Sequence, residues 1–130
     1  MVEFEKGIVR VSENLTFRPG YTFDDFKKCR HYRNQDGIRA ICLGEQADID
    51  GRSYAVEFFF RNGIIHTLSL ICLDRDYTEE DEPKRKELHE EILKQYGIDG
   101  TAEYEWGRVS SDYDVRGNVS SINLEYREEI

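Results

Sequence analysis

Apolar and polar residues alternate along two runs of the chain that are separated by Asn62-Gly63. Side chains in a strand point alternately to its two faces, so each run is typical of a strand with one apolar face. Asn-Gly favours the tight turn of a β-hairpin. The sequence therefore predicts a hairpin of residues 54–60 and 64–73. The side chains expected to share an apolar face are Tyr54, Val56, Phe58 and Phe60 in the first strand and Ile64, His66, Leu68, Leu70 and Cys72 in the second.

Two other segments repeat their apolar residues at helical spacing. Thr22 is a typical N-cap residue, and the apolar residues that follow it at a spacing of three predict a short helix. A longer helix is predicted over residues 83–96, because Leu88, Ile92 and Tyr96 repeat every four residues and form one apolar stripe.

Shorter apolar runs predict the remaining strands, at residues 7–11, 15–17, 38–43, 47–49, 102–109 and 119–127. The run 38–43 is apolar on both faces and is expected to be a central strand. The last two runs are expected to pair as a hairpin. The order of elements lacks the strand–helix–strand alternation of a parallel sheet. The sequence therefore predicts one α+β domain of residues 1–130, with a single antiparallel sheet of about five to seven strands, one long helix in the C-terminal half and one short helix in the N-terminal half.

The net charge of the chain is −9, and most of it comes from one segment. Residues 74–105 contain twelve acidic and five basic residues, whereas residues 1–73 contain ten of each. A strongly acidic protein repels phosphate groups, so nucleic acid is not expected as a partner. Acidic surfaces attract cationic proteins and speed their association.

Hydropathy and cysteine usage bear on the compartment. No apolar run approaches the roughly 20 residues that span a bilayer, so no membrane partner is expected. The first residues lack the basic and apolar regions of an export signal. The three cysteines, Cys29, Cys42 and Cys72, are odd in number and widely spaced, which is typical of reduced thiols. These observations predict a cytoplasmic protein.

The acidic residues cluster between the predicted hairpin and the long helix. They do not form a calcium loop, because a loop beginning at Asp74 would have Glu79 where glycine is needed and Arg85 where glutamate is needed. Three interpretations remain: the acids stabilise the helix N-terminus, they form a docking surface for a basic protein partner, or, least favoured, they hold a metal ion in another arrangement. The residues expected to contact such a partner are Asp74, Asp76, Tyr77, Glu79, Glu80 and Asp81.

In its small size, its acidic charge and its lack of catalytic motifs, the chain resembles the immunity proteins that neutralise bacterial toxins. The resemblance implies a non-catalytic inhibitor whose acidic surface fills a cationic cleft of its target. It is a resemblance of size and charge, and it transfers no motif and no residue. The function predicted from the sequence is therefore protein binding.

A basic stretch, residues 27–33, follows the short predicted helix and surrounds Tyr32. Cations beside an aromatic ring are able to bind phosphate groups or nucleic acid. Cations are also favoured at the C-terminal end of a helix, and in an acidic molecule this is the interpretation we adopt.

Metal and catalytic motifs are missing from the sequence. The cysteines and histidines lack the closely paired spacing of structural zinc ligands, so neither a metal nor another cofactor is expected. The glycine motifs of nucleotide-binding loops and of serine hydrolases are absent. An enzyme would have to use scattered residues such as His66, Glu57 and Cys42, so the chain is not expected to be an enzyme.

Aromatic residues provide the alternative to protein binding. Tyr54, Tyr104 and Trp106 are candidates to line a ligand pocket between the sheet and the long helix. Such a pocket would make the protein a small-ligand-binding or regulatory domain. At strand spacing, the same residues are also typical of a sheet core.

Overall fold

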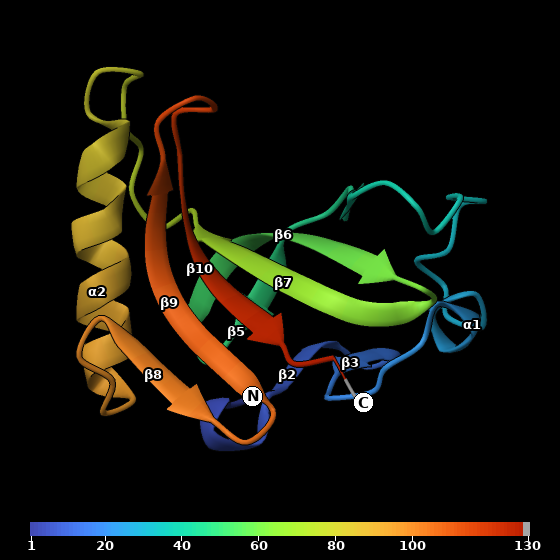
Figure 1. The fold of residues 1–130 in the computed structure, drawn as a ribbon. Helices are drawn as coiled ribbons and strands as arrows, with labels where there is room; N and C mark the ends of the chain where they lie inside the picture. The colour runs from blue at the N-terminus through green and yellow to red at the C-terminus, as the bar shows by residue number, and fades with distance from the viewer. Residues whose placement is uncertain (129–130) are drawn as a thin grey trace.

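Ten strands and two α-helices make up the computed structural model, which describes residues 1–128 (Figure 1). In chain order the elements are β1 (Val2–Glu3), the short 3₁₀ helix η1 (Phe4–Lys6), β2 (Ile8–Ser12), β3 (Leu15–Phe17), α1 (Phe23–Phe26), β4 (Ile41–Cys42), β5 (Ala47–Ile49), β6 (Arg52–Arg61), β7 (Ile64–Cys72), the 3₁₀ helix η2 (Glu82–Lys84), α2 (Arg85–Gln95), β8 (Thr101–Tyr104), β9 (Gly107–Asp114) and β10 (Val119–Tyr126).

Seven of these strands form one antiparallel sheet in the order β4-β6-β7-β10-β9-β8, with β5 paired to β6 next to β4. The β6–β7 hairpin lies at its centre and turns at Asn62 and Gly63. Both residues have positive φ, 53° and 77°, as a tight hairpin turn between twisted strands requires. The predicted hairpin is confirmed by the register, which pairs Tyr54 with Cys72 and Val56 with Leu70.

The beginning of β7 departs from the predicted pattern. The register between β6 and β7 shifts at Phe59 and Phe60, so that Ile65 rather than His66 lies opposite Phe60. A bulge of this kind places an extra residue on one strand and turns its side chains over. Ile65 is therefore buried and Ile64 is 45% exposed. The prediction that Ile64 and His66 share the apolar face of β7 is wrong.

The mixed α+β fold with antiparallel strands is confirmed, but the prediction of a single sheet is wrong. Strands β1, β2 and β3 form a separate three-stranded sheet. Its strands are joined by short connections and pair locally, and Pro19 and Gly20 end the meander. Phe17 of β3 packs on Phe58 of β6 with ring centroids 4.8 Å apart. The buried apolar side chains of the two sheets form one core.

The predicted central strand 38–43 is also wrong. Only Ile41 and Cys42 are in a strand, which pairs with β6 near the sheet edge, and Ile38 is 74% exposed. The Asp36 side chain accepts hydrogen bonds from the amides of Ile38 and Arg39 at 2.9 and 3.1 Å. These bonds hold the backbone in a local turn and compete with strand pairing.

The predicted strand 102–109 is divided by a tight turn. Tyr104 pairs with Gly107, so β8 and β9 form their own hairpin with Glu105 and Trp106 at its tip. Strand β9 then pairs with β10 along its whole length. The closing hairpin is therefore β9–β10, with its turn at residues 115–118.

Helix α2 and the small sheet cover the same face of the large sheet (Figure 1). On this face Ser111 of β9 contacts the Lys86 carbonyl of α2, and Phe58 packs against the small sheet and against Phe26 of α1. Thr22 caps α1 by accepting a hydrogen bond from the Asp25 amide at 3.0 Å, as predicted. Among residues 1–128, no helix is long and apolar enough to cross a membrane.

The opposite face of the large sheet carries polar side chains. Asn123 of β10 accepts a hydrogen bond from Ser69 at 2.6 Å and donates one to Asp112 at 2.8 Å. Phe59 lies on this face too and packs edge-on against His66, with ring centroids 5.7 Å apart. One side of the sheet is thus committed to the core and the other is left accessible.

Candidate functional site

Some of the acidic residues that precede α2 are neutralised within the molecule. Asp74 accepts hydrogen bonds from the Ser53 amide at 3.0 Å and from the Arg52 guanidinium at 3.3 Å. The bond from the Ser53 amide is the main reason that the pKa of Asp74 is below its usual value. Asp81 pairs with Lys84 at 3.3 Å. Two of the residues predicted to contact a partner thus already have partners within the chain.

Arg85 anchors the loop that carries the acids. Its buried guanidinium donates hydrogen bonds to the carbonyl oxygens of Cys72 and Arg75. It also pairs with Glu82 at 2.8 Å and lies 4.7 Å from the centre of the Tyr77 ring. A buried charge needs such partners to offset the loss of its hydration. The contact of Tyr77 with Arg85 is therefore structural. The Arg85 side chain alone contacts the loop at its start, in its middle and at its end.

His89 lies one turn after Arg85 on α2 and is fully buried. Its Nε2 accepts a hydrogen bond from the Cys72 amide at 3.0 Å, which places the proton of the neutral ring on Nδ1. Nδ1 has no hydrogen-bond partner among the residues that the structure describes. Burial, together with the positive charge of Arg85, lowers the pKa of His89 to about 4.

This pKa predicts that the folded state loses stability as the pH falls. An unfolded His89 binds a proton with its ordinary pKa of 6.5, whereas the folded residue resists protonation down to about 4. Unfolding therefore takes up a proton between these values. We expect His89 to lower the free energy of unfolding by about 2 kcal/mol between about pH 7 and pH 5. The measurement is urea denaturation of the wild type and of His89→Gln at both pH values. We expect the free energy of unfolding to fall less in His89→Gln than in the wild type. Equal falls in the two proteins would show that His89 is not the group that titrates.

A second group of acids remains free, and we call it the acidic edge: Asp76, Glu79, Glu80, Glu87 and Glu91. The first three lie on the loop before η2, and the last two lie one turn apart on the exposed side of α2. Among residues 1–128 none of the five forms an ion pair. In Figure 1 the loop and α2 follow one another down one side of the molecule. The segments that carry the five carboxylates therefore lie along a single flank.

The charge of this flank extends beyond α2. Asp99 in the following turn and Glu103 on β8 are also exposed, and neither forms an ion pair within residues 1–128. The cations on the same stretch that lack an acidic partner there are Arg75 and Lys94. Carboxylates that are not neutralised locally produce a negative potential in the surrounding water.

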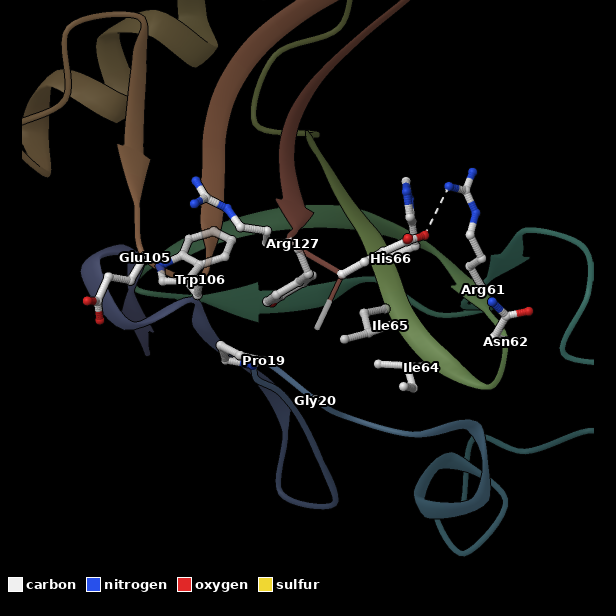
Figure 2. Close-up of a pocket in the computed structure, with 12 residues that line it drawn as sticks. Pro19, Gly20, Arg61, Asn62, Ile64, Ile65, His66, Glu105, Trp106 and Arg127 are labelled. Atoms are coloured by element: carbon white, nitrogen blue, oxygen red, sulfur yellow. Dashed lines mark hydrogen bonds and ion pairs between the residues drawn. The ribbon is translucent and has the colours of Figure 1, made fainter. Parts of the chain in front are cut away.

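A different site lies where the two sheets meet near the end of β10, at a hollow of about 260 Å³ (Figure 2). Its walls come from four segments that are far apart in the sequence: the chain after β3, the β6–β7 turn, the tip of the β8–β9 hairpin and the end of β10. The apolar lining residues are Pro19, Ile64, Ile65, Trp106 and Tyr126, and the charged or ionisable ones are Arg61, His66, Glu105, Arg127 and Glu128.

Trp106 is held in the wall of the hollow by a hydrogen bond and by ring packing. Its indole Nε1 donates a hydrogen bond to the Phe4 carbonyl oxygen at 3.0 Å. The ring stacks on Tyr104, with centroids 5.8 Å apart and planes inclined by 10°, and packs against Tyr126 at 5.0 Å. The Trp106 carbonyl also accepts a hydrogen bond from the Arg127 amide at 2.7 Å. The wall of the hollow is therefore preorganised by the core.

The predicted aromatic residues take different places in the structure. Trp106 lines the hollow, and Tyr104 supports it by stacking. Tyr54 is buried in the core between β5 and β7 and is not part of the hollow. The hollow also lies between the two sheets, whereas the sequence predicted a pocket between sheet and helix.

Two of the four lysines and arginines in the basic stretch 27–33 are neutralised by acids of the chain. Lys27 pairs with Asp24 at 3.1 Å and Arg30 with Glu45 at 3.1 Å. The Arg33 guanidinium donates hydrogen bonds to the carbonyl oxygens of Arg30 and Tyr32. These contacts are consistent with the interpretation that the cations lie at the C-terminal end of the short helix because its dipole favours them there.

The scattered residues considered for catalysis do not assemble into a reactive group. His66 Nδ1 is hydrogen-bonded to Thr67 at 2.7 Å, and Cys42 lies opposite Glu57 across β4 and β6. Partial desolvation, together with the charge of Glu57, raises the pKa of the exposed Cys42 thiol, which disfavours the nucleophilic thiolate. Within residues 1–128, no group of three or more His, Cys, Asp or Glu side chains is arranged to hold a metal ion.

Comparison with known proteins adds no assignment: no protein-family model, no curated protein and no solved structure matches this chain. The free acidic edge and the hollow are therefore the features of the molecule that bear on its function.

Sequence reasoning missed residues at both sites. Glu87 and Glu91 lie opposite the apolar stripe of α2, and helical periodicity alone would have placed them on its exposed side. Ile64 and Arg127 reach the hollow because of a strand bulge and a long-range strand order. The local pattern carries no signal for either.

Proposed function

We propose that this chain is a non-catalytic binding protein whose acidic edge docks a basic protein partner. The observation that supports the proposal is the unequal pairing of charges between residues 74 and 95. Five carboxylates there have no ion-pair partner among residues 1–128, and they follow one another on a loop and a helix. Surfaces of one sign raise the association rate of an oppositely charged protein.

Rigidity supports the same proposal. The loop with Asp76, Glu79 and Glu80 is fastened by Arg85 and by the hydrogen bond from Asn118 to the Glu79 carbonyl at 2.8 Å. A preorganised surface loses less conformational entropy on binding than a mobile one. The internal contacts of Asp74, Tyr77 and Asp81 therefore support the edge, and the free carboxylates are the expected contacts.

The partner class follows from charge. A cationic cleft that binds nucleic acid in the target is complementary in charge to a row of carboxylates, because carboxylates, like phosphates, are anions that its lysine and arginine side chains attract. A toxin neutralised by an immunity-like protein is the kind of target we propose.

We predict that neutralising the edge weakens binding. The test variant replaces Glu79, Glu80, Glu87 and Glu91 with glutamine, and the measurement uses a protein captured from cell lysate by the immobilised wild type at about 50 mM salt. Removing four unpaired charges from the contact surface should weaken affinity by about a hundredfold.

The matched control replaces four acids on other elements, Glu3→Gln, Glu5→Gln, Glu13→Gln and Asp48→Asn, which also lack ion pairs among residues 1–128. It removes the same net charge and should change affinity by less than about threefold. Equal losses in both variants would show that only net charge matters. Unchanged affinity in the edge variant would place the interface on another surface.

A further inference from the structure

We propose that the hollow between the two sheets binds a small apolar carboxylate, with a body about as large as a branched or aromatic amino-acid side chain. This goes beyond the proposed protein-binding function, because the hollow and the acidic edge are different surfaces. The proposal rests on the size of the hollow, on its apolar floor and on the cations at its rim.

The size limits the ligand. The hollow measures about 260 Å³, just below the range of roughly 300–1,000 Å³ that is typical of sites for drug-sized ligands. A single aromatic ring or a branched aliphatic group with one polar group is of suitable size. A nucleotide is too large to be enclosed.

The floor is apolar and fixed. Ile65 and Tyr126 are buried, and Trp106 is held by its hydrogen bond to Phe4 and by ring packing. Ile64 is 45% exposed at the mouth, and Figure 2 shows it beside Ile65 and across the hollow from Trp106. The exposed Ile64 side chain and the Trp106 ring give an apolar ligand group two surfaces to pack against. Removing the ligand group, Ile64 and Trp106 from water together favours binding.

The rim favours an anion. Arg127 donates one hydrogen bond to the Tyr104 carbonyl at 3.3 Å and forms no ion pair within residues 1–128. His66 uses Nδ1 for its bond to Thr67, which leaves Nε2 free of partners in the described chain. A guanidinium with free donors matches the two oxygens of a carboxylate.

The acids at the rim leave this preference in place. Glu128 is paired with Arg61 at 3.3 Å, so these two charges compensate each other. Glu105 lies on the far side of Trp106 from Ile64 and Ile65, at the outer wall (Figure 2). Among the cations at this rim, Arg127 is the one without a counter-ion within residues 1–128, and Glu105 at the outer wall is the acid without one.

Trp106 is the single tryptophan of the chain, so its fluorescence reports on the hollow directly. The experiment titrates the full-length protein with phenylacetate while tryptophan is excited selectively. We expect a saturable emission change with a dissociation constant of about a millimolar or below, as the small number of ligand atoms allows. Phenylacetamide, which has the same shape and no charge, should bind about tenfold more weakly.

Two variants locate the site. Arg127→Gln should weaken phenylacetate binding about tenfold and remove the preference over phenylacetamide. Arg116→Gln removes an exposed arginine in the β9–β10 turn, outside the lining of the hollow, and should leave the titration unchanged. Both positions are exposed, so the variants should keep the wild-type melting temperature.

Three results would overturn the proposal: no saturation of the emission change, equal affinity for phenylacetate and phenylacetamide, or the same weakening in Arg116→Gln as in Arg127→Gln. Each result would leave the acidic-edge proposal standing, since that proposal depends on other residues.

Discussion

Replacing Gly107 with alanine is expected to lower the free energy of unfolding by about 4 kcal/mol. Gly107 ends the tight turn between β8 and β9 and has a φ of 151°, which residues with side chains rarely adopt. A Cβ atom there would overlap the carbonyl oxygen of Glu125 in the neighbouring strand β10. Main-chain atoms in a paired strand cannot move aside without breaking the ladder, so strain and overlap add.

The measurement is urea denaturation followed by circular dichroism, and Gly44→Ala is the matched control. Gly44 has no positive φ, and a Cβ added to it would meet no atom within 4 Å. The control should change stability by less than about 0.5 kcal/mol. If Gly107→Ala were as stable as the control, the hairpin that places Trp106 in the hollow would be described incorrectly.

The second large effect is expected at Arg85. Replacing Arg85 with glutamine removes the partner of Glu82 and leaves the carbonyl oxygens of Cys72 and Arg75 without their donor. Breaking a buried ion pair by removing one partner leaves an uncompensated charge. The free energy of unfolding should therefore fall by about 3 kcal/mol.

Lys84→Gln is the control for this variant, because it makes the same charge change at the preceding residue. Lys84 is exposed and, among residues 1–128, pairs only with Asp81, so its loss should cost less than about 1 kcal/mol. Because Arg85 fastens the loop of the acidic edge, Arg85→Gln should also speed amide hydrogen exchange in residues 73–82. Similar destabilisation and exchange in the two variants would show that Arg85 does not anchor the loop.

The parts of the fold that the sequence predicted well are those fixed by local chemistry. Asn62-Gly63 favours positive φ at both residues, and the hairpin forms there. Leu88 and Ile92 recur at helical spacing, and both are buried on the side of α2 that faces the large sheet. Thr22 caps α1 through a bond that spans three residues. Each signal lies within one turn of helix or one strand.

The predictions fail where the structure of a segment depends on competing local hydrogen bonds or on contacts between residues far apart in the sequence. Asp36 draws the chain into a turn at Ile38 and Arg39, and the strand expected at 38–43 is confined to Ile41 and Cys42. Apolar and polar residues keep alternating from β8 through the turn at Glu105 and Trp106 into β9. The pattern therefore reads as one strand over residues 102–109, although the chain turns in the middle of it. The hollow brings Ile64 and Arg127 together through the pairing of β7 with β10, which no local pattern encodes.

The acidic segment shows the same limit at the site. Composition located the excess charge in residues 74–105, but it gave equal weight to every carboxylate. The structure distinguishes them: Asp74, Asp81 and Glu82 have cationic partners in the chain, while the acidic edge has none among residues 1–128. Pairing depends on distances across the fold, so it could not be read from the sequence.

The dependence of the association rate on ionic strength tests the acidic edge most directly. The rate constant for binding of the captured partner would be measured by stopped flow at about 20 and 500 mM salt, for the wild type and for the variant with Glu79, Glu80, Glu87 and Glu91 replaced by glutamine. We predict a fall of about tenfold or more for the wild type and less than about threefold for the variant. A wild-type rate that is insensitive to salt, or the same salt dependence in both proteins, would contradict the proposal that these carboxylates guide a basic partner.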